Sequence, residues 1–224
     1  TRRHSMIGQL ALDFRLARDT TFENYVGQAA AKLSVLRGIG YLWGEPETGR
    51  SHLLQALCHA AREEDRSAIY LENPRAYDPA VLDGLESMSV IGIDDIEGVL
   101  GDRDWELALF HLINAVHDRG GYLVICGSRP AKRLSVELRD LQSRLNSAVA
   151  IQTDRLSDSE KLEVLKHRAR LRSFTLNDEV GRYLMGRVPR SMRILMDMLE
   201  RIEVETLVRQ KKVTIPLVKE TLGI

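Results

Sequence analysis

The chain has 224 residues, and its 32 basic and 32 acidic side chains leave no formal net charge. This balance excludes a uniformly basic nucleic-acid coat and a polyacidic tail, and 44% hydrophobic residues are typical of a soluble globular protein. The two cysteines, Cys58 and Cys126, lie in apolar stretches and are expected to be reduced core residues. Because the sequence shows neither an 18-residue apolar run nor a signal peptide, we expect a cytoplasmic protein without a membrane span.

Five short apolar runs, separated by amphipathic stretches, predict the strands of a parallel sheet covered by helices. They cover residues 39–43, 67–71, 90–93, 122–126 and 148–152, and helices are expected over 53–61 and 105–116.

After Asp154 the strand patterns stop. Ser157 or Asp158 can cap one helix and Asn177 a second, a third is expected to start near Arg190, and a short one includes Pro216 in its first turn. The sequence therefore predicts an α/β domain followed by an all-helical module.

The strongest motif follows the first predicted strand, where residues 44–51 read GEPETGRS. The spacing is that of a phosphate-binding loop, with Arg50 where lysine is usual. Glycines let backbone N–H groups face an anion, and the Ser51 hydroxyl would reach Mg²⁺. Because arginine is a planar fork and not a compact charge, we expect nucleotide binding to survive the change better than hydrolysis. An ordinary glycine-bearing turn is the alternative.

Polar residues also follow the third and fourth predicted strands. Asp94 and Asp95 end the strand at 90–93, where phosphate-loop proteins place an aspartate that holds the Mg²⁺ hydration shell and an acid that orients water. The alternative is a pair that caps the next helix. Ser128 can reach the γ-phosphate region, although a strand-ending turn would also explain it.

Three arginines are candidates for contacts with phosphate. Arg144 lies at the expected end of a helix on the domain edge, where it could face a neighbour's nucleotide or only solvent. Arg190 and Arg193 are three residues apart near the start of a predicted lid helix and so are expected on one face. They could fold over a nucleotide or form surface ion pairs.

The succession of motifs resembles the AAA+ ATPases and, from about Gln9 to the C-terminus, is similar to the Hda family of DnaA-related regulators. The segments that carry the resemblance are GRSHLL (49–54), IDDIE (93–97), LSDSEKLEVLKHRARLRSFTLNDEVGRYL (156–184) and TIPLVKET (214–221). The resemblance implies a tail over 1–20, an AAA+ P-loop α/β domain over 21–154 and a small helical lid domain over 155–224.

The resemblance also implies residue roles. Residues 44–51 would be Walker A, with Asp94 and Asp95 as Walker B and Ser128 as sensor 1. Arg144 would be an arginine finger that acts in trans, and Arg190 the lid sensor, with Arg193 as its alternative. ADP or ATP with Mg²⁺ is the implied cofactor, and Ser51 and Asp94 would hold the metal through the nucleotide. The implied nucleotide contacts are Tyr25, Val26, Gly44, Thr48, Gly49, Arg50, Ser51, His52 and Arg190.

Residues 9–14 read QLALDF, with Leu10, Leu12 and Phe14 at alternating positions. An extended peptide of this pattern can place its apolar side chains in pockets while Gln9 makes polar contacts. The segment resembles the motif by which replication proteins bind the bacterial sliding clamp, the β subunit of DNA polymerase III. An edge strand is the alternative.

The resemblance implies a nucleotide-bound adaptor that, with the DNA-loaded clamp, stimulates ATP hydrolysis by DnaA and so negatively regulates initiation of replication. DNA contact would then be indirect, through the clamp, and a homo-oligomer is possible. Two alternatives are an autonomous ATPase of the DnaC-like helicase-loader type and a structural adaptor whose nucleotide only stabilises the fold. The zero net charge conceals an asymmetry, since residues 1–154 carry 17 basic and 22 acidic side chains and residues 155–224 carry 15 and 10. Such a distribution favours oriented docking on a protein.

Overall fold

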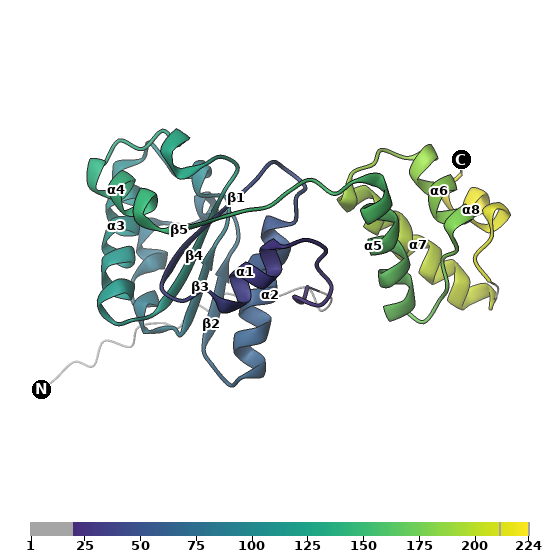
Figure 1. The fold of residues 1–224 in the computed structure, drawn as a ribbon, viewed down its shortest axis with the longest axis horizontal. Helices are drawn as coiled ribbons and strands as arrows, with labels where there is room; N and C mark the ends of the chain where they lie inside the picture. The colour runs from purple at the N-terminus through teal and green to yellow at the C-terminus, as the bar shows by residue number, and fades with distance from the viewer. Residues whose placement is uncertain (1–19, 211, 224) are drawn as a thin grey trace, which may run out of the picture.

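The computed structural model describes residues 20–210 and 212–223. A five-stranded parallel sheet with strand order β2-β3-β4-β1-β5 forms the centre of the larger part (Figure 1). The strands are β1 Ile39–Trp43, β2 Ala68–Leu71, β3 Val90–Ile93, β4 Tyr122–Gly127 and β5 Val149–Gln152. The five predicted strands are confirmed, with ends that differ by at most one residue.

Helices cover both faces of this sheet (Figure 1). One face packs against α1 Ala29–Val35 and α2 Arg50–Glu63, and the other against α3 Arg103–Asp118 and α4 Arg139–Ser147. Successive residues of a strand point to opposite faces, so Val124 belongs to the core under α2 and Ile125 to the core under α3. Such burial on both faces explains why the strands read as continuous apolar runs.

The helical part has a core of its own, formed by α5 Asp158–Leu171, α6 Asp178–Arg187, α7 Met192–Arg209 and α8 Ile215–Leu222. A capping box begins α5, where the Ser157 side chain accepts from the Glu160 N–H and the Glu160 carboxylate accepts from the Ser157 N–H. Figure 1 shows this part joined to the sheet by the segment that follows β5. Of the helices described, not one is long and apolar enough to cross a membrane.

Two local features differ from the expectations, whereas Arg144 lies in the last turn of α4, at the end of a helix as predicted. Helix α1 was not predicted. The third lid helix begins at Met192, since Ser191 takes the extended N-cap conformation. Arg190 therefore precedes α7 and does not share a helical face with Arg193.

Candidate functional site

The predicted site residues come from segments that leave the carboxyl edge of the sheet. The loop at 44–49 follows β1, Asp94 follows β3 and Ser128 follows β4. Strands β3, β4 and β1 are adjacent in the sheet, so the topology brings these three segments together. In open α/β sheets this edge is where ligands bind.

The loop at 44–49 is braced by its own side chains and by the end of β5. The Thr48 hydroxyl donates to the Glu45 carbonyl (2.8 Å) and lies 2.6 Å from the Thr153 hydroxyl. A Cβ on Gly44 would lie 2.0 Å from that same Thr153 oxygen, so only glycine fits. Gly49, at φ 84°, forms the left-handed N-cap of α2. The loop is thereby held as a compact turn with the α2 N-terminus at its end.

Arg50 places a cationic group in this turn. Its Nη1 atom is buried and has no hydrogen-bond partner among the described residues. Burial and neighbouring carboxylates raise the pKa of Asp95, and the Arg50 charge opposes this rise only in part. A buried donor without a partner is costly, and the α2 N-terminus adds positive potential. The Arg50 Nη1 atom and the α2 N-terminus are thus both groups that an anion could satisfy.

The two aspartates after β3 differ in environment. Asp94 is buried, and its carboxylate accepts from the Tyr70 hydroxyl (3.0 Å) and from the Asp95 N–H (2.9 Å). Asp95 is exposed and has a left-handed backbone, with φ 50°. Partial burial and the carboxylates of Glu97 and Asp94 raise the pKa of Asp95. Asp94 is therefore oriented by hydrogen bonds, whereas Asp95 is free to turn towards a ligand.

Ser128 is held by a residue that sequence reasoning did not single out. Its N–H and its hydroxyl both donate to Oε1 of Glu97, at 2.6 and 2.8 Å. Glu97 lies in the 3-10 turn Ile96–Gly98 that follows the two aspartates. The only sequence signal for it was its place within the IDDIE segment.

Tyr25 lies against the loop. Its hydroxyl donates to the Thr48 carbonyl (3.1 Å), and a Cβ on Gly49 would come within 2.7 Å of its ring. Burial and the Asp154 carboxylate raise the pKa of Tyr25 to about 12. Tyr25 and Val26 line a cavity of about 180 Å³ together with Arg193 and with residues of α5 and α7.

His52 joins three segments. Its Nε2–H donates to the Thr21 carbonyl (2.8 Å), its Nδ1 lies 3.4 Å from a guanidinium nitrogen of Arg168 in α5, and its ring centre is 5.8 Å from that of Tyr25. Burial lowers the pKa of His52 to about 4, so the ring is neutral at pH 7. The same cavity is lined by His52.

The lid residues approach the loop from the other side. A second cavity, of about 320 Å³, lies between Glu47 of the loop and lid residues that include Lys161, Arg190 and Ser191. The Ser191 hydroxyl donates to Glu47 (2.5 Å), whereas Arg190 pairs with Asp158. The two candidate lid arginines thus line different cavities, Arg190 beside the loop and Arg193 beside Tyr25.

The remaining predicted residues lie on α4, directly after the loop in α2, or outside the described residues. Arg144 is exposed on α4 and forms no ion pair or hydrogen bond through its side chain within residues 20–210 and 212–223. Ser51 is exposed in the first turn of α2. The segment at 9–14 lies outside the described residues. Across the described chain, no cluster of three or more His, Cys, Asp or Glu side chains could hold a metal ion.

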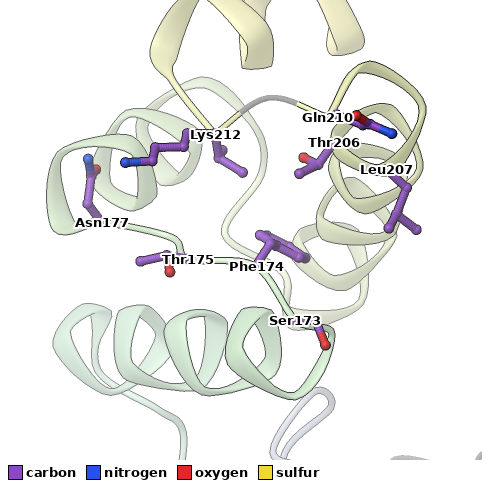
Figure 2. Close-up of a pocket in the computed structure, with 9 residues that line it drawn as sticks. Ser173, Phe174, Thr175, Asn177, Thr206, Leu207, Gln210 and Lys212 are labelled. Carbon is purple, nitrogen blue, oxygen red and sulfur yellow. The ribbon is translucent and has the colours of Figure 1, made fainter.

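The lid also has a larger groove that the sequence did not predict. The groove has a volume of about 700 Å³. Figure 2 shows Phe174 near its centre, Thr206 and Leu207 on one helix, and Asn177 and Lys212 opposite. None of the predicted site residues lines it.

Comparison with known proteins relates the two parts of the chain to replication proteins. Residues 158–222 match the family model described as "Hda, lid domain". Domain III of the Thermotoga maritima replication initiation protein DnaA is similar in fold, with a TM-score of 0.77 and 21% identity over 93% of this chain and 98% of that one.

Two further structures have the same fold. AMPPCP-bound DnaA from Aquifex aeolicus has a TM-score of 0.70 at 20% identity, covering 85% of this chain and 67% of that one. The RuvB Holliday junction branch migration motor of Thermotoga maritima has a TM-score of 0.68 at 19% identity, covering 93% and 73%. The chain thus has the AAA+ fold that DnaA and RuvB share, with a helical lid that matches the lid of Hda.

Proposed function

We propose that the protein is a nucleotide-bound regulator of the Hda type, which acts with the DNA-loaded sliding clamp to stimulate ATP hydrolysis by DnaA. In this proposal the site at the carboxyl edge of the sheet holds ADP or ATP. In this proposal hydrolysis removes ATP-bound DnaA, and initiation of replication is inhibited because less of this form remains.

Nucleotide binding is supported by the buried, unpartnered Arg50 nitrogen at the N-terminus of α2. Gly49 is the left-handed N-cap of α2, whose N-terminus favours a bound anion, and Thr153 and Tyr25 fill the space that side chains at 44 and 49 would need. The fold relatives include DnaA bound to AMPPCP, which is consistent with a nucleotide at this edge.

The residues present fit an adenine nucleotide with Mg²⁺. Gly44, Thr48, Gly49 and Arg50 would surround the phosphates, and the apolar cavity beside Tyr25, Val26 and His52 would take the base. Ser51 and Asp94 supply a hydroxyl and a carboxylate, which are hard oxygen ligands that suit Mg²⁺. Arg190, beside the loop, and Arg193, beside the base, would close the site from the lid.

The action on DnaA depends on Arg144, and its exposed position is the observation that carries this part of the proposal. A guanidinium on the surface of α4, unpaired among the described residues, is available to a partner subunit. An arginine offered in trans to the γ-phosphate of a partner can raise its hydrolysis rate about 10³- to 10⁵-fold. Clamp binding would depend on Gln9, Leu10, Leu12 and Phe14.

The experiment is a reconstitution of ATP-bound DnaA, DNA-loaded clamp and this protein, with hydrolysis followed over time. We expect Arg144→Ala to abolish most of the stimulation. Arg139→Ala is the matched control, because Arg139 is also exposed on α4 and the structure describes no side-chain partner for it. Equal rates with wild type and Arg144→Ala would overturn the arginine-finger role and favour a structural adaptor.

The clamp is tested in the same assay with a Gln9→Ala, Leu10→Ala double variant. We expect this variant to behave like a reaction without clamp. Hydrolysis by this protein alone, at a rate that neither DnaA nor the clamp changes, would instead favour a helicase-loader-like ATPase.

A further inference from the structure

The two donors of Ser128 are already engaged by one oxygen atom. Oε1 of Glu97 accepts both the Ser128 N–H (2.6 Å) and the Ser128 hydroxyl (2.8 Å). A carboxylate oxygen in this place has the same charge sign and acceptor character as a phosphate oxygen. With both donors of Ser128 occupied, the residue has none left for a bound anion.

The backbone delivers Glu97 to this position. Asp95 takes the left-handed conformation, with φ 50°, and starts the 3-10 turn Ile96–Gly98, whose Ile96 is fully buried as an anchor. Glycine at position 127 leaves room for the Tyr41 and Glu97 side chains, because a Cβ there would lie 2.1 Å from the Tyr41 hydroxyl and 3.2 Å from Oε2 of Glu97. The turn and the glycine together place a carboxylate beside the end of β4.

The surroundings of this carboxylate hold charges of both signs, because Glu97 and Ser128 line a cavity of about 260 Å³ together with the exposed Arg129 and Arg133. Its second oxygen, Oε2, is buried and has no hydrogen-bond partner among the described residues. Two more carboxylates, those of Asp94 and Asp95, lie between the end of β3 and this turn. An anionic group that binds at Ser128 would have to displace the Glu97 carboxylate from both donors, whatever attraction the two arginines provide.

The loop at 44–49 lies on the other side of β4. Because β1 pairs with β4 in register from Ile39–Leu123 to Trp43–Gly127, the loop leaves β1 beside the residue that precedes Ser128. A nucleotide held by this loop would extend its terminal phosphate towards Ser128, and a diphosphate would end one phosphate short of it.

We propose that Glu97 is a specificity-determining residue, whose carboxylate competes with the γ-phosphate for the donors of Ser128 and makes the site prefer nucleoside diphosphates over triphosphates. This inference rests on the nucleotide site proposed above. It assigns Glu97 a role in distinguishing nucleoside diphosphates from triphosphates, beyond any role in folding.

The test is to measure the Kd of ADP and of AMPPCP, both with Mg²⁺, for wild type, Glu97→Gln and Glu97→Ala. We expect the ratio of the AMPPCP Kd to the ADP Kd to fall about tenfold in both variants, equal to about 1.4 kcal/mol, with a nearly unchanged ADP Kd. Glu137→Gln is the matched control, because it removes one exposed negative charge that has no contact with Ser128. Its ratio should equal that of wild type.

Each outcome has one meaning. An unchanged ratio in variants that still bind both nucleotides would overturn the role of Glu97 and leave the nucleotide site intact. Failure of wild type to bind either nucleotide would overturn the proposed site itself and the inference with it. Glu97→Gln keeps the size and acceptor oxygen of the side chain, so it provides the test if Glu97→Ala does not fold. A proportional loss for both nucleotides would show a structural role and would also overturn the proposal.

Discussion

The two sides of the candidate site are held by different kinds of contact. On the sheet side, the buried Thr48 and Thr153 hydroxyls are 2.6 Å apart, and Asp94 is buried with two hydrogen-bond donors. On the lid side, Arg190 and Asp158 form an ion pair whose side chains are 58% and 54% exposed. Exposed pairs contribute about 0–1 kcal/mol, whereas loss of a buried partner costs about 1–3 kcal/mol or more. The buried contacts on the sheet side are therefore expected to contribute more stability than this exposed pair on the lid side.

The largest loss of stability is expected for Glu106→Ala, which removes a buried hydrogen-bond acceptor. Glu106 is fully buried in α3 and accepts backbone N–H groups of Gly101, Glu137 and Leu138. The change leaves these donors unsatisfied, so we expect the free energy of unfolding in urea to fall by about 3–5 kcal/mol. In the lid, Glu203→Ala removes a partly exposed ion pair with Arg172, and we expect a loss of about 1 kcal/mol. Similar losses for the two variants would contradict the contrast.

Substitutions at two glycines, one in the loop and one in the lid, are expected to change stability by the next largest amount. Gly44→Ala forces a Cβ to within 2.7 Å of the Thr153 carbonyl, a backbone atom, and we expect a loss of about 1–3 kcal/mol. Gly186, in α6 of the lid, has open space around it, so Gly186→Ala should stabilise by about 0.5–1 kcal/mol. Urea unfolding of both variants checks the signs. Destabilisation by Gly186→Ala would mean that the lid is packed as tightly as the loop.

The junction between the two sides is expected to be sensitive to pH. His52 has a pKa of about 4 in the folded chain, below its ordinary value of 6.5, because burial disfavours the charged ring. The unfolded chain therefore binds more protons between these values, and stability falls as pH decreases from about 6.5 towards 4. We expect wild type to lose about 2 kcal/mol more than His52→Gln between pH 7 and pH 5. Parallel pH profiles of the two proteins would refute a neutral, buried His52.

The smallest effect on stability is expected for Arg190→Ala. This variant breaks only the exposed ion pair with Asp158, so the free energy of unfolding should change by about 0.5 kcal/mol or less. A nucleotide affinity measured on the same sample separates ligand binding from folding. A loss of stability as large as that of Gly44→Ala would show that the lid is fixed by Arg190.

The strands and the phosphate-loop motif could be predicted because they depend on local sequence. Central strands buried on both faces read as apolar runs, and the caps at Ser157 and Asn177 are short-range patterns. Helix α1 was missed because it has seven residues and its N-cap, Gln28, makes no side-chain capping bond.

The contacts that shape the site could not be predicted in the same way. Glu97 and Ser128 are 31 residues apart and meet because β3 and β4 are adjacent. Glu106 and Glu137 are also 31 residues apart and meet because α3 and the start of α4 pack in one core. The separation of Arg190 from Arg193 depends on the extended conformation of Ser191. Tertiary pairing and a single backbone angle decide these positions, and neither leaves a periodic pattern in the sequence.

The strand order also has a consequence for the order of events during folding. The loop at 44–49 is braced by Thr153, more than a hundred residues later in the chain, and β1 pairs with both β4 and β5. Contacts between distant segments form slowly, and the contacts among the lid helices span much shorter stretches of the chain than the contact between Thr48 and Thr153. A growing polypeptide therefore cannot complete the phosphate loop until β5 has been added to the sheet. We expect nucleotide binding only after the whole sheet has been synthesised, so binding would indicate that the sheet is complete.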